Sequence, residues 1–172
     1  MYSNEIEMYP DIIEWLKKNL EQKFGKKAKK ITVLDTHDSD LLNFIMQLNY
    51  QKFFPEFTTY KIRQDITGFI EYEDKVELVF VECKNTSLSL IHLSQLIGYS
   101  CIALPIHSIL LSPQGMGQTL NKLLKDYNRL DILEFRPKRM IQIIKWDKTK
   151  QDVNVTLLNA VGLIIVPSIS VQ

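Results

Sequence analysis

Cysteine is scarce in this 172-residue chain, which contains only Cys83 and Cys101. Two cysteines cannot form a disulfide framework, and neither has a second Cys or His at the spacing of a zinc site. Each lies in an apolar stretch, Cys83 in a predicted strand and Cys101 in a predicted helix. We therefore expect both to be buried as small hydrophobic side chains, in a protein of a reducing compartment.

Long hydrophobic runs and a basic N-terminal segment are also lacking. No apolar stretch reaches the ~18 residues that a membrane span requires. The N-terminus, MYSNEIEMYP, carries acidic residues where a secretory signal would carry basic ones. We therefore expect a cytoplasmic protein with no membrane partner.

A strong net charge is missing as well, because 21 Lys and Arg against 20 Asp and Glu leave +1. Binding to a polyanion must therefore depend on local patches. The densest cationic run follows the first predicted helix and contains Lys26, Lys27, Lys29 and Lys30. It has two interpretations, which are a solvated helix end that complements the helix dipole and a patch that contacts phosphates.

The remaining composition, 45% hydrophobic and 24% charged, is that of an ordinary globular protein. The length suits one domain, and no internal repeat, low-complexity segment or flexible linker divides it. We expect a core over residues 1–128 and a β-rich C-terminal extension, 129–172, packed on the same domain.

Hydrophobic periodicity predicts an alternation of helices and strands. Predicted helices are 10–24, 40–50, 88–104 and 118–127. Predicted strands are 31–35, 57–62, 66–72, 76–83, 106–111, 130–135, 140–146, 153–158 and 161–166. A polar turn at 72–75 makes an antiparallel hairpin, and the helix at 88–104 makes a parallel crossover to the strand at 106–111. The predicted inward faces are Ile13, Leu16, Leu20 and Phe24 in the first helix, and Leu90, Leu93, Ile97, Cys101 and Leu104 in the third.

The most informative stretch, residues 62–84, carries Asp65, Glu82 and Lys84. Side chains two apart in a strand point to the same face, so Glu82 and Lys84 share one face and Cys83 takes the other. The hairpin brings Asp65 to the same end of the sheet. Two close carboxylates repel each other, and a divalent cation relieves that repulsion. Mg²⁺ prefers such oxygen ligands, and the backbone carbonyl of Cys83 is a further candidate.

The alternative interpretation is that Glu82 and Lys84 are an ordinary polar pair on a strand. The apolar neighbours Val79, Phe80 and Val81 argue against it, because charged side chains are seldom fully buried unless they are paired. In a metal centre, Mg²⁺ would lower the pKa of a water and offset charge on a phosphorus atom. Lys84 would hold that water or stabilise the transition state.

This pattern resembles the PD-(D/E)XK phosphodiesterase superfamily, which has an Asp in a short hydrophobic motif followed by Gly, a hairpin, and then hydrophobic-Glu-X-Lys. The resemblance implies a restriction-endonuclease-like core, with a central mixed β-sheet flanked by helices in the order αβββαβ. It also implies that Asp65 and Glu82 bind the metal and that Lys84 assists the nucleophile. The chain departs from the pattern at Gln64, where the family has Pro in a position without a chemical role.

The next predicted helix carries Gln95 and Tyr99, which resemble the Gln-X-X-X-Tyr motif of the RecB-like branch of this superfamily. The spacing of four places both on one helix face. By resemblance, Gln95 positions the substrate or a water at the metal, and Tyr99 lies nearby as a substrate-binding residue. His92 shares their face, either as a phosphate contact or as a helix-surface residue.

Many members of the superfamily also place an acidic residue of the first helix in the site. Glu5, Glu7 and Glu14 are the candidates in this chain. Glu5 is preferred as a further metal ligand, because it lies one turn before Tyr9.

The resemblance implies a nuclease that hydrolyses DNA phosphodiester bonds with Mg²⁺, for which Mn²⁺ can substitute. The lysines of 17–30 and the basic run 136–139 would grip the DNA backbone. Two alternatives are an inactive nucleic-acid-binding module on the same fold and a subunit that cuts only with a partner. The apolar strand at 161–166 needs cover, and a homodimer interface is one way to provide it. Endonuclease and exonuclease activity are both open.

Overall fold

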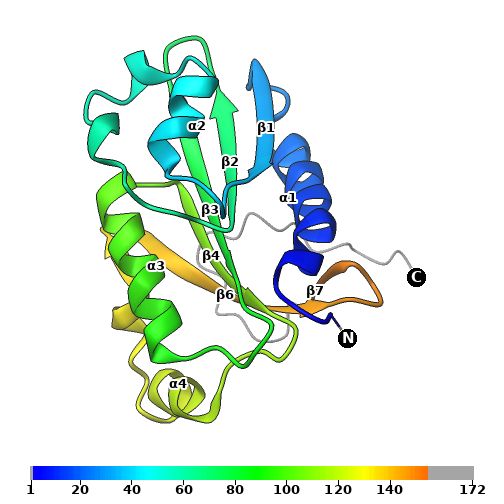
Figure 1. Cartoon of the computed structure of the whole chain (residues 1–172). Coiled ribbons are helices and arrows are strands. Elements are labelled where there is room, and N and C mark those ends of the chain that lie inside the picture. The colour runs from blue at the N-terminus through cyan, green and yellow to red at the C-terminus, as the bar shows by residue number, and fades with distance from the viewer. Residues whose placement is uncertain (1, 155–172) are drawn as a thin grey trace.

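The computed structural model describes residues 2–154, which form a mixed β-sheet with helices on both faces (Figure 1). The sheet has seven strands in the order β1-β2-β3-β4-β6-β5, and β7 pairs with β6. The strands are β1 Lys30–Asp35, β2 Ile66–Glu71, β3 Val76–Cys83, β4 His107–Ser112, β5 Glu134–Arg136, β6 Arg139–Asp147 and β7 Asp152–Asn154. This arrangement confirms the predicted α/β class with a central mixed sheet flanked by helices.

The α-helices of residues 2–154 are α1 Tyr9–Phe24, α2 Leu41–Gln47, α3 Leu90–Ala103 and α4 Gln118–Asn121. One face of the sheet is covered by α1, and the other by α2 and α3 (Figure 1). Pro10 lies in the first turn of α1, where its missing N–H leaves no helical hydrogen bond unmade. A short 3₁₀ turn, Ile6–Met8, leads into this helix.

The connections between the central strands are those that the sequence predicts. Strands β2 and β3 form an antiparallel hairpin in which Ile66 lies opposite Val81. Strand β4 runs parallel to β3, and α3 crosses between them. Further along, β6 pairs in parallel with β4, so the chain after residue 128 adds strands to the same sheet. The division of the chain at residue 128 stays a prediction.

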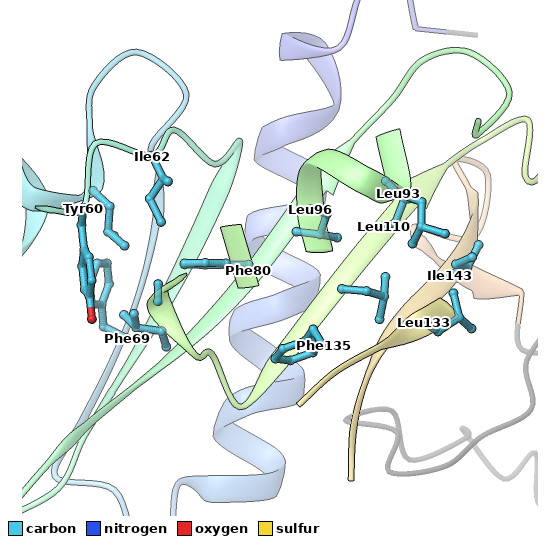
Figure 2. Close-up of a cluster of buried hydrophobic side chains, with 14 of the residues drawn as sticks. Tyr60, Ile62, Phe69, Phe80, Leu93, Leu96, Leu110, Leu133, Phe135 and Ile143 are labelled. Atoms are coloured by element: carbon cyan, nitrogen blue, oxygen red, sulfur yellow. The ribbon is translucent and has the colours of Figure 1, made fainter. Parts of the chain in front are cut away.

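The central strand β3 is covered on both faces because nearly every residue in it is apolar. Val81 and Cys83 belong to the core on the α1 side. Leu78 and Phe80 belong to the core on the α3 side, where Figure 2 shows Phe80 in a cluster that also holds Leu96 of α3. A charged side chain at the end of this strand therefore leaves water and needs a partner.

One predicted strand, 57–62, is wrong. Residues Phe57–Thr59 form a 3₁₀ turn, in which the N–H of Tyr60 donates to the carbonyl of Phe57. The large apolar residues of this stretch join no ladder, since Tyr60 and Ile62 fill the core on the α3 side (Figure 2). The neighbouring edge of β2 is already paired with β1.

The inward faces of two helices are rotated from the predicted ones. In α1 the residues Tyr9, Ile12, Trp15, Leu16 and Leu20 are buried, and the predicted Ile13 and Phe24 pack only partly. In α3 the buried residues are Leu93, Leu96, Ser100 and Ala103. The prediction that Cys101 is buried is therefore wrong, since its side chain is exposed, whereas Cys83 is buried as predicted. Apolar residues lie all around α3, so periodicity could not select its inward face.

Smaller differences concern the later elements. Residues Leu130–Leu133 form a 3₁₀ turn before β5, in place of one continuous strand. Helix α4 ends at Asn121 and continues as a π-helical turn, Lys122–Asp126. The predicted strand 161–166 and most of 153–158 lie outside the described residues. Between residues 2 and 154 we found no helix with the length and apolar character needed to cross a membrane.

Candidate active site

The candidate site lies where β2 begins and β3 ends. Asp65 immediately precedes β2, and its Oδ2 accepts a hydrogen bond of 2.7 Å from the N–H of Cys83. Glu82 lies next to last in β3. The ammonium of Lys84 lies 2.9 Å from Glu82 Oε1 and 3.8 Å from Asp65 Oδ2. The hairpin therefore brings together the carboxylate pair and the lysine, as their spacing predicts.

The N-terminal segment contributes two more contacts. Glu5 Oε2 lies 3.3 Å from the ammonium of Lys84, and the hydroxyl of Tyr9 donates to Asp65 Oδ1 at 2.7 Å. Of the other acidic candidates, Glu7 accepts a hydrogen bond from the N–H of Ser3 on the surface, and Glu14 is exposed on α1. The structure thus brings Glu5, and neither Glu7 nor Glu14, to the lysine. Whether Glu5 binds a metal stays a prediction.

Helix α3 reaches the site through Gln95, whose Nε2 donates to Glu82 Oε1 at 3.2 Å. This contact follows from strand alternation, because Glu82 lies on the same face as Phe80, and α3 covers that face. Tyr99 lies one turn further along α3 and packs partly against the core. Its predicted role in substrate binding stays a prediction.

His92 has a structural task at the start of α3. Its Nδ1 accepts a hydrogen bond from the N–H of Ser89, and its own N–H donates to Ser89 Oγ, which together form a capping box. Burial and the charge of Lys84 lower the pKa of His92. A ring nitrogen that accepts from a backbone N–H carries no proton, so only Nε2 is left to contact a phosphate.

Burial, and after it the nearby charge of Asp65, raise the pKa of Glu82 to about 7. Burial also raises the pKa of Asp65, although Lys84 opposes the shift. Burial alone would lower the pKa of Lys84, but Glu82 and Asp65 outweigh it and raise that pKa above its usual range. The site therefore holds two carboxylates that repel each other around one firmly protonated amine.

One structural observation indicates that Asp65 and Glu82 fit a divalent cation. Glu82 Oε2 is buried and has no hydrogen-bond partner among the described residues, and the Glu82 side chain is only 3% exposed. A buried carboxylate oxygen without a partner is costly, and a cation would satisfy it. No group of three or more His, Cys, Asp or Glu side chains within residues 2–154 could hold a metal by itself. Two carboxylates fill only part of the coordination shell of Mg²⁺, so Asp65 and Glu82 would leave positions for water and phosphate.

The predicted lysine patch lies away from this site. Lys30 pairs with Glu71 at the start of β1, whereas Asp35, at the other end of that strand, pairs with Ile66 beside the site. Lys26, Lys27, Lys29 and Lys30 are therefore separated from the carboxylates by the length of β1, about 17 Å. Lys29 also forms an ion pair with Glu71. The structure does not bring these lysines together with the carboxylates, so any phosphate that they bind lies well away from Asp65 and Glu82.

The predicted basic run 136–139 is also distant from the carboxylates. It lies where β6 begins, and β6 runs parallel to β4 and β3, so only the last residues of β6 lie at the end of the sheet that holds the site. The guanidinium of Arg139 donates to the carbonyls of Leu104 and Pro105, just after α3. Its role in the structure is thus to satisfy backbone groups at the end of that helix.

Sequence reasoning missed a second polar group beside Asp65. His37 Nδ1 lies 2.6 Å from Asp35 Oδ1, and its ring lies 5.4 Å from that of Tyr9, measured between centroids. A hydrogen bond to Asp35 raises the pKa of His37. The backbone places this pair at the site, because the N–H of Thr36 donates to the carbonyl of Asp65. The Asp-X-His spacing after a strand was a signal that could have found it.

Comparisons with protein-family models, curated proteins and solved structures gave no match for this chain.

Proposed function

We propose that this protein is a Mg²⁺-dependent nuclease that hydrolyses DNA phosphodiester bonds. The observation that carries the proposal is the convergence of Asp65, Glu82 and Lys84 at one end of the sheet, with a buried oxygen of Glu82 left without a partner. The order α1-β1-β2-β3-α3-β4 supports a restriction-endonuclease-like core, in which α2 is inserted between β1 and β2.

In this proposal Asp65 and Glu82 hold the cation. Mg²⁺ when bound, or Mn²⁺ in its place, lowers the pKa of water and offsets the negative charge that grows on the phosphate. Tyr9 and the N–H of Cys83 each donate to a different oxygen of Asp65, so they keep its carboxylate in one orientation. Gln95 orients Glu82 in the same way from α3. Tyr9 and Gln95 are therefore positioning residues.

Lys84 acts on the substrate. Its ammonium lies among the carboxylates of Glu5, Asp65 and Glu82 and has three donors to share among them and a phosphate oxygen. Its raised pKa keeps it charged at neutral pH, so it is suited to stabilise negative charge and to orient a water, rather than to remove a proton from it. Glu5 limits the movement of this ammonium by its own contact of 3.3 Å.

Cleavage of plasmid and single-stranded DNA in MgCl₂ or MnCl₂ tests the proposal. We expect Asp65→Asn, Glu82→Gln and Lys84→Met each to lower the rate by about 100-fold or more, because each removes a group that acts on the charge of the reacting phosphate. Asp131→Asn is a matched control, since Asp131 is an exposed carboxylate that pairs with Arg129. Wild-type cleavage by the Asp65→Asn protein would overturn the assignment of the site.

Thermal unfolding in MgCl₂ separates metal binding from cleavage. A ligand at 100 times its Kd stabilises the folded state by about 2.7 kcal/mol, which raises the Tm of a chain of this length by roughly 5–10 °C. We expect this shift in the wild type and not in Asp65→Asn. A shift without cleavage of any DNA would contradict an active nuclease and favour the inactive or partner-dependent module.

A further inference from the structure

The segment that leads into the site alternates between exposed and buried side chains. Lys61 and Arg63 are exposed, Ile62 and Gln64 are buried, and Asp65 follows. Figure 2 shows the Ile62 side chain directed into the core on the α3 side. Lys61 and Arg63 therefore lie on the exposed side of this segment, four and two residues before Asp65.

Backbone contacts hold this segment in place. The carbonyl of Ile62 accepts from the N–H of Leu41, and the carbonyl of Gln64 accepts from the hydroxyl of Thr36. Asp65 is held by the N–H of Thr36 as well. Arg63 therefore stays near Asp65, because two residues of chain span at most about 7 Å.

Both cations keep hydrogen-bond donors available for a ligand. The Nε of Arg63 donates to Asp40 at 2.8 Å, which orients the guanidinium and engages one of its five N–H groups. In Arg129, by contrast, two nitrogens are bonded to Asp131. Lys61 forms no ion pair with any residue that the structure describes. Asp40 is the acidic group that faces Arg63 most closely.

We propose that Lys61 and Arg63 bind neighbouring phosphates of the nucleic acid strand on one side of the cleaved bond. The proposal rests on the nuclease function, and it adds the path along which the strand reaches Asp65. The step between the two side chains is of the same order as the step between successive phosphates of a strand.

The basic residues of this track differ from those that sequence density favours. The lysines after α1 lie at the opposite end of β1 from Asp65, whereas Arg63 is two residues from it. Phosphate contacts set the register of a nucleic acid on a protein without reading its sequence. The track therefore gives the strand a direction relative to the two carboxylates.

Fluorescence anisotropy of a labelled single-stranded oligonucleotide tests the track in buffer with EDTA, in which metal-dependent cleavage does not occur. We expect Lys61→Gln and Arg63→Gln each to weaken binding about 10-fold, since each removes a charge-assisted contact. The double variant should weaken the salt dependence, so that the negative slope of log K against log salt decreases in magnitude by about 1.4, which corresponds to two contacts with a single strand. Arg129→Gln is the matched control, and Lys26→Gln tests the distant lysines.

Cleavage kinetics supply the second readout. Contacts with phosphates away from the cut are made equally in the ground state and the transition state, so the variants should raise KM and leave kcat nearly unchanged. If the wild type cleaves DNA and the double variant keeps the wild-type affinity and salt slope, the track is wrong and the nuclease function stands. If the wild type neither binds nor cleaves nucleic acid, both proposals are overturned.

Discussion

At the scale of single residues, Gln64 is the least satisfied group beside the site. It directly precedes Asp65, is only 1% exposed, and neither atom of its side-chain amide has a partner among residues 2–154. Burying an amide without a hydrogen bond costs about 1–3 kcal/mol in proteins. Its backbone carbonyl does have a partner in the hydroxyl of Thr36. The side chain therefore opposes folding, whereas its backbone helps to hold Asp65.

Replacing Gln64 by Met should remove this cost while keeping a similar shape. We expect Gln64→Met to raise the free energy of unfolding by about 1 kcal/mol, or the Tm by about 2–4 °C, in urea and thermal unfolding. Thr67→Val serves as a comparison, since the buried hydroxyl of Thr67 is hydrogen bonded to Thr36, and its loss should destabilise the fold. A lower Tm for Gln64→Met would mean that the amide does have a partner, such as a buried water.

The residue scale also shows how far alternation along a strand can be used. It predicted correctly that Glu82 and Lys84 share a face and that Cys83 takes the other, because that depends only on the pleat. It could not predict that Tyr9 and the N–H of Cys83 both bind Asp65, because one of these donors lies 56 residues away.

At the scale of elements, the packing of α1 on β2 depends on Gly68. A Cβ at this position would lie 3.1 Å from Leu20 Cδ1 and 3.3 Å from Val79 Cβ. The absence of a side chain therefore lets the helix approach the strand closely. Helix α1 carries Tyr9 at its first turn, so this close approach also helps to place the hydroxyl that binds Asp65.

Gly68→Val should overpack this interface and lower the free energy of unfolding by about 1–3 kcal/mol, as measured in urea. Gly98 on α3 is the matched control, since a Cβ there would meet no atom within 4 Å. Gly98→Ala should raise stability by up to about 1 kcal/mol, because Ala favours a helix over Gly. Equal stability of Gly68→Val and the wild type would show that α1 does not need this approach.

Sequence patterns predicted two features of the elements wrongly, the strand at 57–62 and the buried face of α3. Residues 57–62 contain strand formers, yet they form a 3₁₀ turn followed by irregular chain that carries Lys61. Local propensity cannot foresee that β1 takes the edge of the sheet that such a strand would need. Helix α3 was predicted within a few residues at each end, but its buried face was not, because it is apolar on every side.

At the scale of the whole molecule, buried titratable groups lie at both ends of the sheet. Asp65 and Glu82 lie at the end where β3 finishes, and His107 begins β4 at the opposite end. His107 packs near Phe24. Burial, and after it the charges of Lys23 and Arg139, lower the pKa of His107 to about 3. Between pH 6.5 and about pH 3, His107 therefore stays neutral in the folded protein, whereas the same side chain becomes protonated in the unfolded chain.

This difference predicts acid sensitivity of the whole fold. The folded pKa of His107 lies below its ordinary value of 6.5, so below pH 6.5 the unfolded state binds a proton that the folded state does not bind. The resulting stability is present above pH 6.5 and is lost as the pH falls toward 3.

His107→Phe removes the titrating group and keeps an aromatic ring beside Phe24. We expect the wild type to lose about 3 kcal/mol more than this variant between pH 7 and pH 4, as measured by urea unfolding at each pH. The comparison between the two proteins cancels the titration of carboxylates that they share. Parallel pH profiles for both proteins would contradict the prediction.

The amino-acid sequence by itself determined the α/β class, the bounds of β3, the hairpin and the parallel crossover. It also determined which side chains at the end of β3 can act together. These features depend on periodicity and on the few residues between neighbouring elements, which are local properties. Tertiary structure alone decided which charged groups meet. It brought Glu5, Tyr9 and Gln95 to the carboxylates, left the dense lysine run at the far end of β1, and paired Arg63 with Asp40. Such contacts depend on which ends of the strands adjoin, and that is settled when the sheet assembles and its two cores pack.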